Sequence, residues 1–129
     1  MKTIFLSLIT TSIAFANISI ITPENNKLTN ITQKELTDLF LKKTNHIRGI
    51  KITPIDSLNK ELYENFYKKV VKKTPSQIRE YWINQIYRGN QQPPKRLSND
   101  DIKKEIQKKS MIITYALNPL NGKLILTIK

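Results

Sequence analysis

Short runs of β-branched residues alternate along the chain with segments whose apolar residues recur every three or four positions. Runs of the first kind are typical of buried strands, and segments of the second kind are typical of amphipathic helices. Strands that are separated by helices usually share one sheet, which those helices cover. The sequence therefore predicts an α/β domain, a mixed β-sheet flanked by about four helices, in the order β-α-β-α-α-α-β-β.

The expected strands cover residues 18–21, 50–55, 111–117 and 123–128. The last two flank a segment with Asn-Pro and Asn-Gly pairs, which favour turns. They are candidates for a hairpin, although a loop of about five or six residues is not a tight one.

The first two helices are expected to begin at capping residues. Thr32 and Glu35 have the spacing of a capping box. Asp56 or Ser57 can cap a second helix that runs to about Val71. Apolar residues with helical spacing are expected to face the core from these helices: Leu36, Leu39, Phe40, Leu62, Phe66 and Val70.

The last two helices also have recognisable starts. The Thr-Pro pair at residues 74–75 begins the third helix, whose inner stripe is predicted to be Ile78, Trp82 and Ile86. Ser98 or the residue after it begins the fourth. Residues 90–97 contain a proline pair and are expected to form an extended connector.

The N-terminal sixteen residues have the pattern of a cleavable secretory signal peptide. Lys2 supplies the positive start, an apolar stretch follows, and small residues at Ala14 and Ala16 suit a signal peptidase. The apolar stretch is shorter than the roughly 20 residues of a membrane-spanning helix. We therefore expect a periplasmic or secreted protein, cleaved near Ala16, with no stable membrane insertion afterwards.

Residues 17–129 are enough for one domain. The chain has no cysteine, so its stability must come from a packed core and not from disulfides. It carries 22 Lys and Arg against 10 Asp and Glu, a net charge of +12. Such a charge favours anionic partners, although many of the lysines occur as pairs on expected helix surfaces, where a solvated face explains them.

The sequence offers no recognisable catalytic or metal site. His46 is the only histidine, no cysteine is present, and no glycine-rich phosphate loop occurs. We therefore expect a non-catalytic protein without a cofactor or bound metal. Trp82 falls on the inner stripe of its helix, which favours packing over base stacking, and no nucleic-acid role is expected.

The turn from the second strand into the second helix is the best candidate for a ligand site. Backbone N–H groups at a helix N-terminus attract anions. Ser57 and Asn59 add a hydroxyl and an amide, Lys60 adds a positive charge, and Asp56 could accept a proton from a ligand. Ordinary N-capping is the alternative explanation for the same residues.

Several segments together resemble a known family. They are Leu36 to Lys43, Phe66 to Val71, Thr74 to Gln77, Tyr81-Trp82, Gln85 to Gly89 and Pro93-Pro94. In this order they are similar to short secreted proteins related to the periplasmic phosphate-binding proteins of ABC transporters. The resemblance covers nearly all of residues 17–129 and implies one lobe of a type II periplasmic-binding-protein-like fold.

The resemblance also implies a ligand turn, at residues 56–62. In full-length members a Ser-Gly-Thr turn holds phosphate there, and Asp56 matches the family's acidic residue. This chain lacks Ser-Gly-Thr, since Lys60 to Leu62 fill those positions, and Lys42 stands where the family has glycine.

Two functions follow as expectations. The first is an exported binding module for phosphate or another small oxyanion, linked to ABC transport or sensing. The second is a single-lobe adaptor that binds an envelope protein or transporter and no small ligand.

Overall fold

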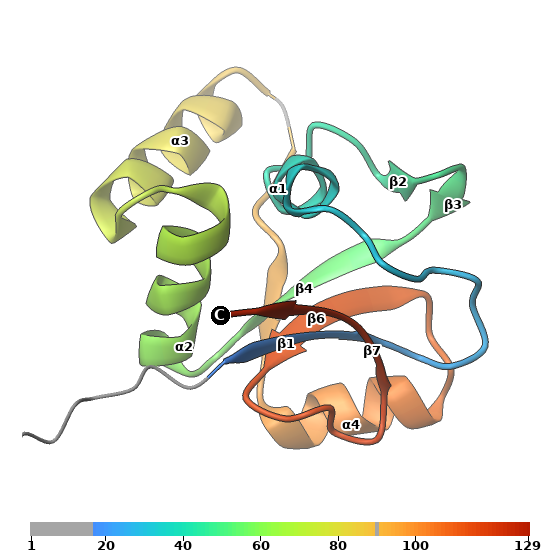
Figure 1. Cartoon of the computed structure of the whole chain (residues 1–129). Coiled ribbons are helices and arrows are strands. Elements are labelled where there is room, and N and C mark those ends of the chain that lie inside the picture. The colour runs from blue at the N-terminus through green and yellow to red at the C-terminus, as the bar shows by residue number, and fades with distance from the viewer. Residues whose placement is uncertain (1–16, 90) are drawn as a thin grey trace, which may run out of the picture.

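The computed structural model describes residues 17–89 and 91–129. The predicted signal peptide, residues 1–16, and its cleavage site at Ala16 lie outside the described residues. Figure 1 shows a central sheet with helices on both of its faces, which confirms the predicted α/β fold class with a mixed sheet.

The main sheet has five strands in the order β5-β4-β6-β1-β7. Strand β4 runs parallel to both of its neighbours, whereas β1 runs antiparallel to β6 and β7. The strands are β1 (Ile18–Thr22), β4 (Thr53–Ser57), β5 (Lys95–Leu97), β6 (Ile112–Ala116) and β7 (Lys123–Ile128).

Three details of the sheet differ from the prediction. The last two strands do not form a hairpin, because β1 lies between β6 and β7. The expected connector contains a short edge strand, β5, which pairs with β4. The expected second strand, residues 50–55, is divided between β3 (Ile50–Lys51) and β4. Strand β3 pairs with a strand that was not expected, β2 (His46–Ile47), in a separate two-stranded sheet.

The helices begin largely where the capping patterns place them. The bounds are α1 (Gln33–Phe40), α2 (Lys60–Phe66), η1 (Tyr67–Val71, a π-helical turn), α3 (Pro75–Tyr87) and α4 (Asn99–Gln107). Thr32 and Thr74 both form complete capping boxes, and Ser98 caps α4. The predicted cap of α2 is wrong: Asn59 caps it, because Asp56 and Ser57 still belong to strand β4.

The helices α1, α2 and α3 cover one face of the sheet and α4 covers the other (Figure 1). The larger apolar cluster joins the sheet to the first three helices and includes Leu36, Phe66 and Trp82. A smaller cluster, with Ile102 and Ile106, joins it to α4. Ile86 is 47 % exposed and not part of the buried stripe, contrary to the prediction.

Candidate functional site

Asp56 is a buried carboxylate at the centre of the sheet. Its neighbour Ile55 packs in the cluster under α4, so alternation along β4 turns Asp56 toward the opposite face. There the hydroxyls of Tyr67 and Tyr115 each donate a 2.8 Å hydrogen bond to one of its two oxygens. The side chain is only 2 % exposed.

Burial raises the pKa of Asp56 to about 7, because removal from water disfavours the charged form. The two tyrosine hydrogen bonds and the charges of Arg96 and Lys42 act in the opposite direction and limit that rise in pKa. Burial, together with the Asp56 charge, also holds the pKa of Tyr67 and of Tyr115 well above that of a free phenol. The carboxyl group can therefore exchange a proton near neutrality, while both phenols remain donors.

The four residues predicted as an anion site are adjacent, but their polar groups are largely engaged within the chain. The Ser57 hydroxyl accepts a hydrogen bond from the backbone N–H of Asn59. The Asn59 side-chain oxygen accepts one from the N–H of Leu62, which is ordinary capping. The exposed ammonium of Lys60 lies 4.0 Å from the carboxylate of Glu64. Together with the Asp56 carboxylate, this arrangement leaves little for an incoming anion at α2, which has only seven residues.

Arg96 is a residue of this region that the sequence interpretation missed. Its Nε donates a 2.8 Å hydrogen bond to the backbone oxygen of Ser57, and its guanidinium lies 4.1 Å from the centroid of the Tyr63 ring. Arg96 lies in the segment that was predicted to be an extended connector, and strand β5, which places it beside Asp56, was not expected. Tyr67 and Tyr115 were likewise not expected to contact Asp56.

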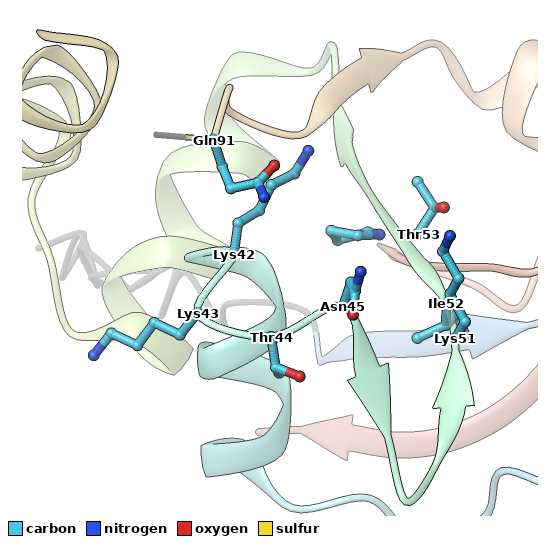
Figure 2. A pocket seen from close by; sticks show the side chains of 9 residues that line it. Lys42, Lys43, Thr44, Asn45, Lys51, Ile52, Thr53 and Gln91 are labelled. Atoms are coloured by element: carbon cyan, nitrogen blue, oxygen red, sulfur yellow. The ribbon is translucent and has the colours of Figure 1, made fainter. Parts of the chain in front are cut away.

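A hollow of about 280 Å³ lies between the end of α1 and the strands that follow it. We call it the lysine hollow, and its lining is Lys42, Lys43, Thr44, Asn45, Lys51, Ile52, Thr53, Pro54 and Gln91. Figure 2 shows the side chains of Asn45, Lys51 and Thr53 on the strand side and Lys42 beside Gln91 across from them. The side chain of Lys43 extends away from this group.

The lining of the lysine hollow has an excess of positive charge, although Lys42 also interacts electrostatically with the nearby Asp56. No carboxylate belongs to its lining, and none of its three lysines forms an ion pair with any residue in the described ranges. Hydrogen bonds hold its frame: the N–H of Ile52 donates to the Asn45 backbone oxygen at 3.0 Å. The site thus presents cationic and amide donors on a fixed backbone.

Lys42 is positioned by the end of α1. It follows the C-cap residue Leu41 with a φ of 55°, in the left-handed region that usually favours glycine. The N–H of Lys42 donates to the oxygen of Leu39, and the N–H of Lys43 donates to that of Asp38, as in a Schellman motif. This backbone turn directs the chain into the lysine hollow.

A second hollow, of about 530 Å³, lies beside Asp56. We call it the arginine hollow, and its lining is Asp56, Leu58, Lys60, Tyr63, Glu64, Pro75, Ile78, Arg79, Trp82, Pro93, Pro94 and Arg96. Of the predicted site residues, Asp56 and Lys60 lie here, and Ser57 and Asn59 are not in its lining.

Within residues 17–89 and 91–129, no group of three or more His, Cys, Asp or Glu side chains could hold a metal ion. In the same ranges, no helix has both the length and the apolar character needed to cross a membrane. Comparisons with models of protein families, with curated proteins and with solved structures found no match.

Proposed function

We propose that this protein is a non-catalytic module that binds phosphate or a similar small oxyanion, and that the anion occupies the lysine hollow. The observation that carries the proposal is the excess of positive charge in that hollow, whose lining has no carboxylate and whose Lys42 and Lys51 form no ion pair with a described residue. Both ammonium groups would attract an anion bound in the hollow.

Neutral donors complement the charge. Asn45 and Gln91 contribute amide groups, and Thr53 contributes a hydroxyl, from the sides of the hollow seen in Figure 2. Phosphate and sulfate oxygens accept hydrogen bonds from all of these groups. The resemblance to phosphate-binding proteins supports the same ligand class. Because only one lobe surrounds the anion, we expect weaker binding than in a two-lobed protein that closes over its ligand.

The test is thermal unfolding of the purified protein, expressed with its own N-terminal segment, in phosphate, sulfate or chloride at constant ionic strength. An anion at 100 times its dissociation constant stabilises by about 2.7 kcal/mol, which is several degrees for a domain of this size. We expect phosphate or sulfate to raise the Tm above chloride. Equal Tm values in all three salts at tens of millimolar would reject an oxyanion site.

Variants locate the site. Lys42→Gln and Lys51→Gln should each reduce the anion-dependent rise in Tm. Lys103→Gln makes the same change of charge on the exposed surface of α4, on the other face of the sheet, and should leave that rise unchanged. An equal loss in all three variants would indicate that net charge is responsible and not the lysine hollow.

We also propose that the protein is exported and acts in the periplasm or outside the cell. The support is the signal-peptide pattern that ends at Ala16. The intact mass of the protein recovered from a secreting host should correspond to a chain that begins at Asn17. Recovery of the full chain from the cytoplasm would contradict export.

One observation favours the adaptor function as a second candidate. Helix α3 exposes Ile83, Ile86 and Tyr87 on one side, and Tyr87 is 91 % exposed. Residues with this spacing share a helix face, and exposed apolar side chains that gather there are typical of a protein interface. Cross-linking in the native envelope should then yield a partner whose recovery is lost in Ile83→Ser and kept in Lys42→Gln. A partner captured equally by both variants would not use this face.

A further inference from the structure

The lining of the arginine hollow differs from that of the lysine hollow in two ways. It has more apolar residues, among them Leu58, Ile78, Pro93 and Pro94. Its lining also includes two arginines, Arg79 and Arg96. Sites for small organic ligands commonly have this composition, in which an apolar wall accompanies a few polar groups that fix the orientation.

Arg96 is held in place before any ligand arrives. Its Nε is occupied by the backbone oxygen of Ser57 at 2.8 Å, and its guanidinium is stacked over Tyr63. The two terminal nitrogens, Nη1 and Nη2, make no hydrogen bond to other described residues. A fixed guanidinium with free terminal N–H groups is suited to a planar carboxylate, because two parallel N–H donors can bind the two carboxylate oxygens.

Arg79 supplies a second guanidinium to the same hollow, and it has no ion pair within the described part of the chain. The two acidic residues of the lining have other partners. Both oxygens of Asp56 accept hydrogen bonds from tyrosines, and Glu64 lies near the Lys60 ammonium. Arg96 interacts electrostatically with the buried Asp56 carboxyl, but neither arginine forms an ion pair with a described residue, so both guanidinium groups can still contact a ligand.

Trp82 provides an independent observation. It belongs to the lining and is 6 % exposed, and its indole N–H is buried with no hydrogen-bond acceptor among the described residues. A buried donor without a partner costs about 1–3 kcal/mol, and such groups are rare in folded proteins. An acceptor brought by a ligand would remove this cost.

We propose that the arginine hollow binds a small organic carboxylate with an apolar body. The carboxylate lies at Arg79 and Arg96, and the body packs against the proline pair and Ile78. Inorganic phosphate has no group to cover the apolar wall, so the two hollows differ in ligand class. This proposal does not depend on an oxyanion in the lysine hollow.

The only tryptophan of the chain lies in this lining, so its fluorescence reports on the hollow directly. We would titrate the full chain with phenylacetate, and in parallel with phenylacetamide and acetate. Phenylacetate should change the Trp82 emission saturably. The amide, which lacks the charge, and acetate, which lacks the body, should each bind at least about tenfold more weakly. No saturable change with phenylacetate, or an equal response to phenylacetamide, would overturn the proposal.

Two variants test the guanidinium groups. Arg79→Gln alters an exposed side chain that forms no ion pair with a described residue, so it should fold normally and weaken phenylacetate binding by about tenfold. Arg96→Gln should weaken binding at least as much, with folding checked by circular dichroism. Arg88→Gln, at the end of the same helix and outside the lining, is the matched control and should bind normally. The proposal would be overturned if Arg79→Gln and Arg96→Gln both bound phenylacetate with wild-type affinity. If Lys42→Gln binds phenylacetate with wild-type affinity, the two hollows act independently.

Discussion

The phenolic hydroxyl of Tyr115 lies 2.8 Å from Oδ1 of Asp56, and this hydrogen bond joins the side chains of the neighbouring strands β6 and β4. The same hydroxyl accepts a hydrogen bond from the backbone N–H of Ser57 at 3.2 Å. The Tyr115 ring is fixed from its other side by Phe66, whose ring is nearly parallel at a centroid distance of 3.8 Å. Tyr67 reaches the second oxygen of Asp56 from the π-helical turn that follows Phe66. The buried carboxyl of β4 is therefore held by hydrogen bonds from two other elements, β6 and the π-helical turn.

This burial predicts a stability that depends on pH. The pKa of Asp56 rises from an ordinary 3.8 to about 7 on folding, so the folded chain binds the proton more tightly than the unfolded chain. Its contribution is fully present below about pH 4 and is lost as the pH rises through about 7. This shift in pKa corresponds to a decrease in the free energy of unfolding on the order of 4 kcal/mol at most. The free energy of unfolding in urea, measured at pH 4.5 and pH 8, should decrease toward pH 8 by more in the wild type than in Asp56→Asn.

The comparison with Asp56→Asn is needed because Glu35 makes stability depend on pH in the opposite direction. Burial tends to raise its pKa, but hydrogen bonds from the Thr32 backbone and Arg48 leave that pKa below its usual value. Stability from Glu35 is therefore lost as the pH falls, in both proteins alike. Glu24→Gln, at an exposed loop position, is the control and should follow the wild type. A difference between the wild type and Asp56→Asn that is the same at both pH values would contradict the assignment.

Removal of either tyrosine hydroxyl should destabilise the fold by different amounts. Tyr67→Phe takes one donor from Asp56 and should cost about 1–3 kcal/mol at pH 8. Tyr115→Phe should cost more, since it also leaves the N–H of Ser57 without its acceptor. Both variants should raise the pKa of Asp56 further, because the lost hydrogen bonds favour the charged form. Urea unfolding and a carbon-13 NMR titration of the carboxyl group measure the two effects. Tyr87→Phe, at an exposed hydroxyl, should change stability by less than about 0.5 kcal/mol.

The helix caps could be predicted from the sequence because they depend on residues three positions apart. Thr32 with Glu35 is a confirmed case, and the same spacing places Gln77 opposite Thr74. The cap of α2 was misplaced by two or three residues, since nothing local shows that β4 continues through Ser57. That continuation depends on pairing with β5 and β6, which come from distant parts of the chain.

Strand order was not predictable for the same reason. Strands β6 and β7 are neighbours in sequence, yet β1 separates them in the sheet. The edge strand β5 consists of Lys95–Leu97, which has none of the apolar alternation by which strands are recognised. Its position depends on hydrogen bonds to β4.

The candidate sites show the same limit. Asp56 is a candidate from the sequence because it precedes an expected helix. Its partners Tyr67 and Tyr115 are 11 and 59 residues away, so no local spacing connects them to it. The pair Lys42-Lys43 is one of the lysine pairs for which the sequence favours a solvated helix surface. Its place in a hollow with Lys51 and Gln91 depends on the turn after α1 and on the return of the chain beyond α3.

Asn59→Ala separates the two candidate anion sites. The Asn59 side chain caps α2 through the N–H of Leu62, so the variant should lose about 1 kcal/mol of stability. Asn59→Asp retains the capping oxygen and should be close to the wild type. If the anion occupies the lysine hollow, the rise in Tm caused by phosphate should be the same in the wild type and in both variants. If Asn59→Ala keeps its fold but loses that rise in Tm, the anion binds at residues 56–60 and not in the lysine hollow.

Lys42 and Lys109 occupy equivalent positions, and this permits a test of stability and binding together. Each directly follows the C-cap of its helix, with φ values of 55° and 56°, and each is followed by a residue whose N–H completes a Schellman motif. A left-handed conformation costs a non-glycine residue roughly 1–2 kcal/mol, and glycine's greater freedom when unfolded offsets part of that gain. Lys42→Gly and Lys109→Gly should therefore each stabilise the fold by up to about 1 kcal/mol in chloride.

Only Lys42→Gly removes an ammonium group from the lysine hollow, so only this variant should lose the additional stability that phosphate confers at constant ionic strength. Urea unfolding of both variants in the two salts measures each effect. An equal response of the two variants to phosphate would mean that Lys42 has no special part in anion binding.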